Sequence, residues 1–174
     1  MRLKLSLLTG LGAGALYAAG LIISHQSGTA ALAAFRSAYT FLPLVIVIIG
    51  LGAVWLRRNE KPAPEVKDLL KYAFLAYTVF ELCYALSSLT VFRWMDPAAS
   101  ENLANFLYRQ TEEKLKNGQG SAEKLEEIKK IADSVKGPMT YIQVLIGMGQ
   151  DLIIDFLKSL FIATITKRTI QPRP

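Results

Sequence analysis

Four ionisable side chains lie within otherwise apolar runs of the chain, and they are the residues best placed to do chemistry. They are Glu81, Asp151, Asp155 and Lys158. Glu81 interrupts an apolar run over residues 72–92, and the other three interrupt a run over residues 141–166. A charge at the centre of a membrane helix costs about 2.5–3.5 kcal/mol on insertion scales. We therefore expect these side chains to be paired with one another and not to face lipid.

Helical spacing predicts which of these side chains share a face. At about 100° per residue, Asp151, Asp155 and Lys158 fall within about 60° of one helix face. At about 1.5 Å per residue, Glu81 and Asp151 both lie about 15–17 Å from the outer ends of their runs, so they can meet near the midplane. Two tyrosines and Ser88 share the face of Glu81. The sequence predicts an intramembrane polar cluster of Glu81, Asp151, Asp155, Lys158, Tyr77 and Tyr84.

Three interpretations of this cluster follow from the residue types. The first is a hydrogen-bonded polar seam that fixes helix packing, with Glu81 or Asp151 protonated in a low-dielectric site. The second is a proton or cation site, because two level carboxylates that share one proton form a carrier group. The third is a contact between subunits. The sequence alone leaves all three open.

Other motifs predict packing and no catalysis. Gly10, Gly14 and Ala18 recur every fourth residue, which lets two helix backbones approach closely in lipid. A dinucleotide site would need an acidic residue about 20 residues after its glycines, and the first acid of the chain is Glu60. With one histidine and one cysteine, the chain offers no zinc-type spacing. We expect no catalytic residue, no cofactor and no metal.

The elements that position the cluster are predicted to be four transmembrane helices. The chain has 174 residues, of which 52% are hydrophobic and 20% charged, a balance that excludes a disordered chain, a coiled coil and a disulfide scaffold. Uncharged runs cover residues 5–35 and 37–56, and runs 72–92 and 141–166 complete the set. We expect an all-α integral membrane protein with a single domain over residues 1–174.

Particular residues punctuate these runs. A short turn centred on residues 25–28 makes the first two spans an antiparallel hairpin, and Pro43 bends the second span or marks its start. A signal peptide that ends near Gly20 is the alternative for the first span. The uncharged run outlasts the apolar segment of a signal peptide, about 7–15 residues, which favours an uncleaved helix.

Charge asymmetry predicts the orientation. One group of segments carries ten cations and three acids: the two ends of the chain, with Arg173 included, and the loop after the second span. The other group, Arg36 and residues 93–136, carries nine cations and eight acids. By the positive-inside rule both termini are cytoplasmic. The basic residues thus predict orientation and contact with anionic lipid. They do not predict nucleic-acid binding, since no basic stripe is interleaved with aromatic residues.

Residues 95–140 are predicted to be an extracytoplasmic helical hairpin inserted between spans three and four. Gly118 and Gly120 divide its two helices, and Ser121 is the expected N-cap of the second. That helix carries an i, i+4 pair of Glu126 and Lys130 and a narrow apolar stripe. The stripe residues Leu125, Ile128 and Val135 are candidates for binding a partner.

Several segments together resemble a known family. They are Met95-Asp96-Pro97, the glycine break at residues 118–123, and the Gly- and Ile-rich run from Tyr141 to Arg168 that ends in basic residues. The pattern is similar to a family of small four-span inner-membrane proteins from Gram-negative bacteria, domain of unknown function 4199. The resemblance implies the topology and an inner-membrane location, and it implies no activity. Asp151, Asp155 and Lys158 depart from it, because small or apolar residues are more usual there.

The favoured function is that of a non-enzymatic accessory or scaffold subunit of the bacterial inner membrane. Its expected partners are membrane lipid and either another membrane protein or further copies of the chain. The alternative is a small proton- or cation-coupled component that uses Glu81, Asp151 and Asp155. An enzyme that acts on lipid-linked substrates is a third hypothesis.

Overall fold

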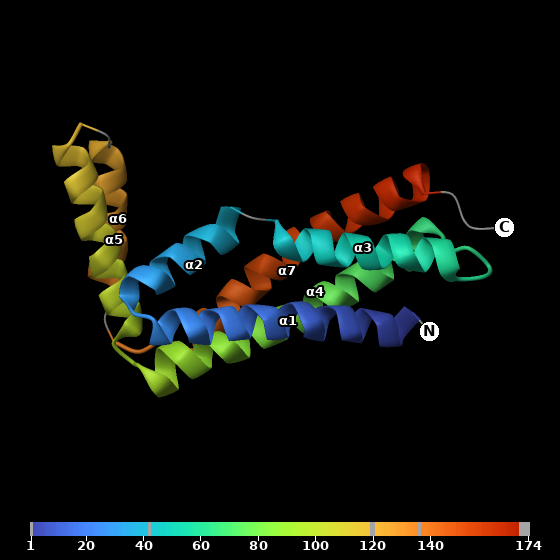
Figure 1. Ribbon diagram of the computed structural model, residues 1–174, viewed down its shortest axis with the longest axis horizontal. Coiled ribbons are helices and arrows are strands. Elements are labelled where there is room, and N and C mark those ends of the chain that lie inside the picture. Colours follow the sequence, from blue (N-terminus) through green and yellow to red (C-terminus); the bar gives the residue numbers. More distant parts are fainter. Residues whose placement is uncertain (1, 42, 119–120, 136, 171–174) are drawn as a thin grey trace. The chain divides into compact units, whose positions relative to one another are not determined.

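The computed structural model describes residues 2–41, 43–118, 121–135 and 137–170, and these are helical apart from short connections. The elements are α1 (Arg2–Gln26), α2 (Thr29–Phe41), α3 (Leu44–Asn59), α4 (Val66–Leu89), the π-helical turn η1 (Thr90–Met95), α5 (Ala99–Lys116), α6 (Ala122–Ser134) and α7 (Tyr141–Thr169), as Figure 1 shows. The predicted all-α class is confirmed over these ranges. Gly120, Lys136 and Arg173, which entered the predictions above, lie outside the described residues.

Two to three segments of the described chain are long and apolar enough to cross a membrane. They are α1, the continuous α4–η1 segment Val66–Met95, and α2 with α3 if that pair is one broken span. The break falls at Pro43, which precedes α3 and has no N–H to continue a helix. The α7 helix covers the whole fourth predicted span but is not among these candidates, because acidic and basic residues interrupt its apolar sequence.

The chain contains two compact units. The first consists of residues 1–18, 42–86 and 145–174, and the second of residues 19–41 and 87–144. The predicted insertion over residues 95–140 falls within the second unit. That the chain is one membrane domain stays a prediction.

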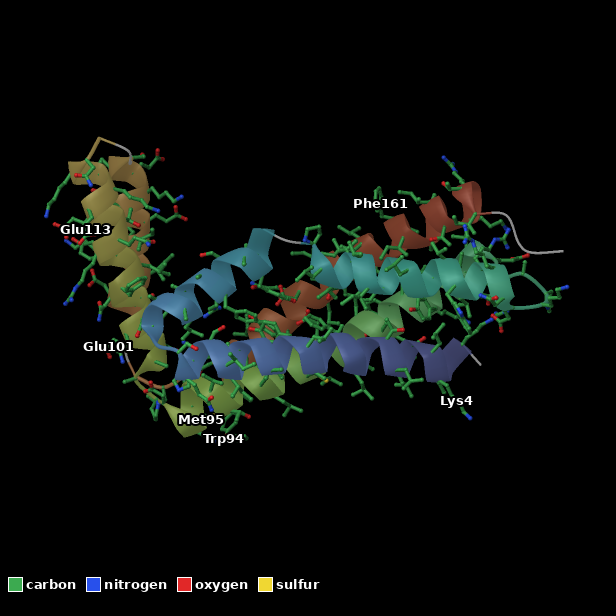
Figure 2. The ribbon with its side chains drawn as sticks, viewed as in Figure 1. Lys4, Trp94, Met95, Glu101, Glu113 and Phe161 are labelled. Atoms are coloured by element: carbon green, nitrogen blue, oxygen red, sulfur yellow. The ribbon has the colours of Figure 1, made fainter. Side chains whose placement is uncertain are left out.

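The core of the first unit is built from α3, α4 and α7. Its fully or nearly fully buried members are Ile49, Ala53, Leu56, Leu69, Tyr72, Ala73, Ala76, Tyr77, Ile162 and Ala163, with Leu5 of α1 packed against them. In contrast, α7 exposes large apolar side chains on its other faces. Phe161 is one of them, and Figure 2 labels it. Such a distribution is typical of a helix whose outer surface meets lipid or another protein.

Three chain segments meet at one end of the first unit. Nε of Arg2 lies 2.7 Å from a carboxylate oxygen of Glu60, and its Nη1 lies 2.6 Å from Asp68. Arg57 donates a hydrogen bond of 3.4 Å to the carbonyl oxygen of Ile170. The beginning of α1, the connection between α3 and α4, and the end of α7 are therefore held together.

Glycines bring α1 against α4. A Cβ atom on Gly10 would lie 2.5 Å from the carbonyl oxygen of Ala76 and 2.7 Å from Cβ of Val79. A Cβ atom on Gly14 would overlap Cβ of Cys83 and lie 2.8 Å from its sulfur. Only a residue without a side chain fits at these two positions of α1.

In the second unit, α5 packs against both α6 and α2, and Figure 1 shows α5 and α6 side by side. The buried residues Leu32 and Ala33 of α2 and Leu103 and Ala104 of α5 form its centre. Gly118 follows α5 with φ of +71°, a conformation that favours glycine. The two predicted helices of this segment are therefore present.

Two predicted details of this segment differ from the structure. Ser121 occupies the N-cap position of α6, but its side chain makes no capping hydrogen bond. Within the described residues, the i, i+4 ion pair forms on α5, where Nζ of Lys116 lies 2.9 Å from Glu112, and not between Glu126 and Lys130. The hydrogen bond to Glu112 raises the pKa of Lys116. Helical spacing permits both pairs, but long exposed side chains gain little free energy from pairing, so spacing alone does not select one.

Candidate functional site

The candidate site lies between α4 and α7 in the first unit. Tyr77 and Glu81 project from α4, and Asp151, Asp155 and Lys158 project from α7. Tyr77 and Asp155 are each 1% exposed and Glu81 is 6% exposed, while Asp151 and Lys158 are half-buried. Charged side chains are almost never this deeply buried unless they are paired. The arrangement therefore raises the question of how each charge is balanced.

Lys158 balances one of the acids. Its Nζ lies 2.8 Å from Oδ1 of Asp155, one turn earlier on the same helix. The same ammonium group lies 5.5 Å from the centre of the Tyr77 ring, within the range of a cation–π contact. The positive charge is thus shared between an acid of α7 and an aromatic face of α4.

Within the described ranges, Glu81 forms no ion pair. Its carboxyl interacts with that of Asp155, which is buried like Glu81, whereas Asp151 is only half-buried. The sequence paired Glu81 with Asp151 on the basis of equal depth, whereas the structure makes Asp155 its main neighbour. The reason is the rotation of α7, which turns Asp155 inward and leaves Asp151 at the edge.

Three buried polar atoms of this cluster have no hydrogen-bond partner within the described ranges. They are the hydroxyl oxygen of Tyr77, Oε2 of Glu81 and Oδ2 of Asp155. Tyr77 lies one turn before Glu81 on α4, and its ring contacts the ammonium group that pairs with Asp155, so the three residues belong to one cluster. Buried polar groups in proteins are nearly always satisfied, and unsatisfied ones often mark functional chemistry. Together these atoms form a site that a shared proton would satisfy.

Other predicted members lie elsewhere. The Tyr84 ring contacts the ring of Tyr17 from α1, with centroids 4.8 Å apart, and so belongs to an aromatic contact between α1 and α4. Ser88 is buried but belongs to the second unit. Conversely, Ser159 is a member that was not predicted: it is fully buried and donates a 2.6 Å hydrogen bond to the carbonyl oxygen of Asp155. Its place one turn after Asp155 could have indicated this.

The described part of the chain contains no group of three or more histidine, cysteine, aspartate or glutamate side chains placed to hold a metal ion. The carboxyls of Glu81 and Asp155 and the hydroxyl of Tyr77 are groups that can exchange protons.

Comparison with known families places the whole cluster in a defined domain. The family described as "Protein of unknown function (DUF4199)" has a model that matches residues 4–168. The chain belongs to this family. The match begins in α1 and ends at the basic end of α7, so all five cluster residues lie within the DUF4199 domain. It confirms the family resemblance drawn from the sequence. No curated protein matches the chain, and no solved structure matches it.

Proposed function

We propose that this DUF4199 protein spans the bacterial inner membrane four times, with both termini in the cytoplasm. The spans are α1, the α2–α3 pair, α4–η1 and α7. The contacts of Arg2 with Glu60 and of Arg57 with Ile170 support this topology. They gather the two chain ends and the α3–α4 connection at one end of the first unit, as an even number of spans requires.

The two tryptophans give further support to this topology. Trp55 and Trp94 are both exposed, and each lies within two residues of an arginine, Arg57 or Arg93. Exposed tryptophan beside basic residues is typical of the membrane–water interface. The segment over residues 95–140 is then a periplasmic hairpin.

This topology predicts opposite accessibility for two exposed positions. In a Cys83→Ala background, Lys61→Cys should react with a membrane-impermeant maleimide only from the cytoplasmic side. Asn117→Cys should react only from the periplasmic side. Labelling in intact cells and in inverted vesicles measures both. Labelling of the two positions from the same side would contradict the four-span topology.

Within this topology, the proposed function is that of a small proton-coupled membrane component, in which the carboxyls of Glu81 and Asp155 bind and release a proton. The burial of Glu81 without an ion-pair partner among the described residues carries the proposal. With Lys158 paired to Asp155, an ionised Glu81 would be an unbalanced charge in a low-dielectric region, which costs several kcal/mol. A shared proton removes that charge and satisfies the orphaned oxygens.

Infrared spectroscopy of the purified protein in lipid nanodiscs tests the proposal, because a protonated carboxyl has a C=O band distinct from that of a carboxylate. We expect wild-type protein to show this band at neutral pH and to lose it as the pH rises. Glu81→Gln should remove the titrating band while the protein still folds, because an amide can hydrogen-bond but cannot titrate. Asp133→Asn, at an exposed position of α6, is the control and should leave the band unchanged.

Two outcomes would contradict the proton site. One is the absence of a protonated carboxyl in the wild type at any pH where the protein is folded. The other is an unchanged titrating band in both Glu81→Gln and Asp155→Asn. Either result would assign the cluster to helix packing alone.

The second candidate function is a non-enzymatic accessory or scaffold subunit, and one observation favours it. The α6 stripe residues Leu125, Ile128 and Val135 are only half-buried although α5 packs on this helix, and the neighbouring Ile131 is 51% exposed. An apolar surface of this kind can bind a partner or a second copy.

Leu125→Glu should then abolish copurification of the partner, while Lys129→Glu on the exposed side should not. A proton-coupled component would tolerate both, so the same infrared measurement on Leu125→Glu separates the two functions.

A further inference from the structure

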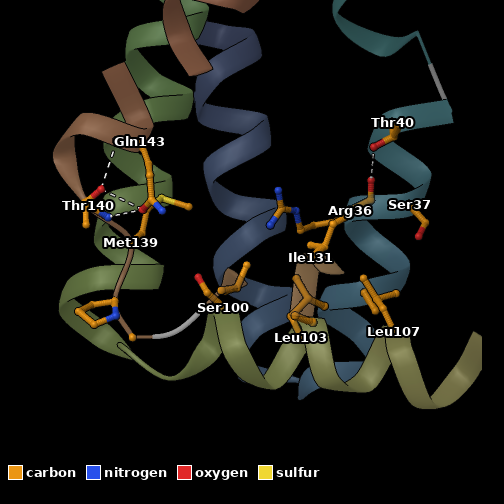
Figure 3. Close-up of a pocket in the computed structure, with 15 residues that line it drawn as sticks. Arg36, Ser37, Thr40, Ser100, Leu103, Leu107, Ile131, Met139, Thr140 and Gln143 are labelled. Atoms are coloured by element: carbon orange, nitrogen blue, oxygen red, sulfur yellow. Dashed lines mark hydrogen bonds between the residues drawn. The ribbon is translucent and has the colours of Figure 1, made fainter. Parts of the chain in front are cut away.

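The second unit contains a cavity that none of the predicted sites includes. It has a volume of about 640 Å³ and is lined by residues from α2, α5 and α6 and from the segment that leads into α7. Figure 3 shows its lining. Ligand pockets in proteins are typically about 300–1,000 Å³, so this one is large enough for a small organic molecule.

Among the described residues that line the cavity, the one charged side chain is Arg36 of α2. Figure 3 shows its guanidinium group directed into the pocket, with Met139, Thr140 and Gln143 on the far side. No carboxylate lies within ion-pairing distance of Arg36 in the described part of the chain. The guanidinium lies over the ring of the buried Phe92, with Cζ 5.5 Å from the ring centre. Within the described ranges the guanidinium therefore has no counter-charge, and its five N–H groups suit a carboxylate or phosphate.

A second donor lies across the pocket from Arg36. The backbone N–H and the hydroxyl of Thr140 both donate to the side-chain oxygen of Gln143, each at 2.9 Å. This fixes the orientation of the amide, and its nitrogen keeps two N–H donors. Since Gln143 lines the same cavity, the polar side of the pocket offers donors and one positive charge.

The rest of the wall is apolar. Leu103 and Leu107 of α5 face the cavity, and Ile131 of α6 and Val135, which directly follows α6, complete this side. A free inorganic anion would leave these side chains against water, whereas an alkyl chain would cover them. The lining thus combines a polar end that suits an anion with a surface that suits a hydrocarbon.

We propose that this pocket binds an anionic amphiphile, a molecule with a carboxylate or phosphate head and an acyl chain. The head contacts Arg36 and Gln143, and the chain lies along the leucines of α5 and the stripe end of α6. The proposal is independent of the carboxyl cluster, which lies in the other unit.

Binding of radiolabelled oleate to the full-length protein tests the proposal, with the protein in nanodiscs of zwitterionic phosphatidylcholine. We expect saturable binding. Oleoyl lysophosphatidate should compete if the site also accepts a phosphate head, so this arm identifies the preferred head group. Oleyl alcohol, which has the same chain and no charge, should compete at least about tenfold more weakly. Inorganic phosphate should not compete.

Substitutions locate the site. Arg36→Gln should weaken oleate binding at least about tenfold, whereas Arg36→Lys should retain much of it. Arg109→Gln removes one cation from the exposed side of α5 and should leave the affinity unchanged within about twofold. Ser100→Phe fills the cavity without altering its charge, so it should weaken the binding of oleate and of the alcohol alike. This variant also keeps the test valid if Arg36→Gln fails to fold.

Three results would overturn the proposal. Oleyl alcohol could compete as well as oleate, which would show that the head group is not recognised. Inorganic phosphate could displace oleate, which would indicate a site for small anions. Arg36→Gln and Ser100→Phe could both bind oleate like the wild type, which would place the bound oleate outside this pocket.

Discussion

Asp155→Leu is expected to lower the free energy of unfolding by about 3 kcal/mol. Breaking a buried ion pair by removing one partner costs about 3–5 kcal/mol, because the other charge is left uncompensated. The lower end of this range of cost applies here, because the side chain of Lys158 is 38% exposed and can move toward a more polar environment. The leucine must also fit a site in which Asp155 is only 1% exposed.

Reversible unfolding in mixed detergent micelles measures this effect, and two variants serve as controls. Asp133→Leu makes the same change at an exposed position of α6 and should alter stability by less than about 0.5 kcal/mol. Asp155→Leu combined with Lys158→Met should recover most of the loss, because replacing a whole buried pair by apolar side chains is often neutral. A single variant as stable as the wild type would show that the pair is not buried as described.

The sequence predicts the faces of the helices well, because helical periodicity fixes which residues of one helix point the same way. Asp155 and Lys158 were expected on one face of their helix, and the structure pairs them. The sequence could not predict which acid meets Glu81. That choice depends on the rotation and axial position of α7 against α4, which the packing of many side chains determines. Because Glu81 and Asp151 lie at equal depth in their runs, Asp151 was the predicted neighbour of Glu81. The rotation of α7 instead favours Asp155.

The pocket around Arg36 could not be predicted from sequence for a different reason. Its lining comes from four separate segments, and neither a motif nor a periodic pattern connects them. In the sequence, Arg36 is only the charge that ends the first uncharged run. Its significance depends on the fact that no carboxylate of the described residues pairs with it, which only the folded structure shows.

Gly10→Ala is expected to destabilise the protein by about 1–3 kcal/mol, the usual cost of overpacking, although alanine is the better helix former. The added Cβ would lie 2.5 Å from the carbonyl oxygen of Ala76, and no side-chain rotation can relieve a contact with a backbone atom. Hence α1 must move away from α4, and the aromatic contact of Tyr17 with Tyr84 would loosen with it.

Gly12→Ala is the matched control on the same helix, two residues further along. A Cβ atom at Gly12 would meet nothing within 4 Å, so only helix propensity acts there, and alanine should stabilise the protein by up to about 1 kcal/mol. The two alanines should therefore change the midpoint of unfolding in opposite directions, with Gly14→Ala following Gly10→Ala because its Cβ would overlap Cys83. Equal shifts for Gly10→Ala and Gly12→Ala would mean that α1 does not pack against α4 through these glycines. Opposite shifts would show that the missing side chains at Gly10 and Gly14 set the distance between α1 and α4.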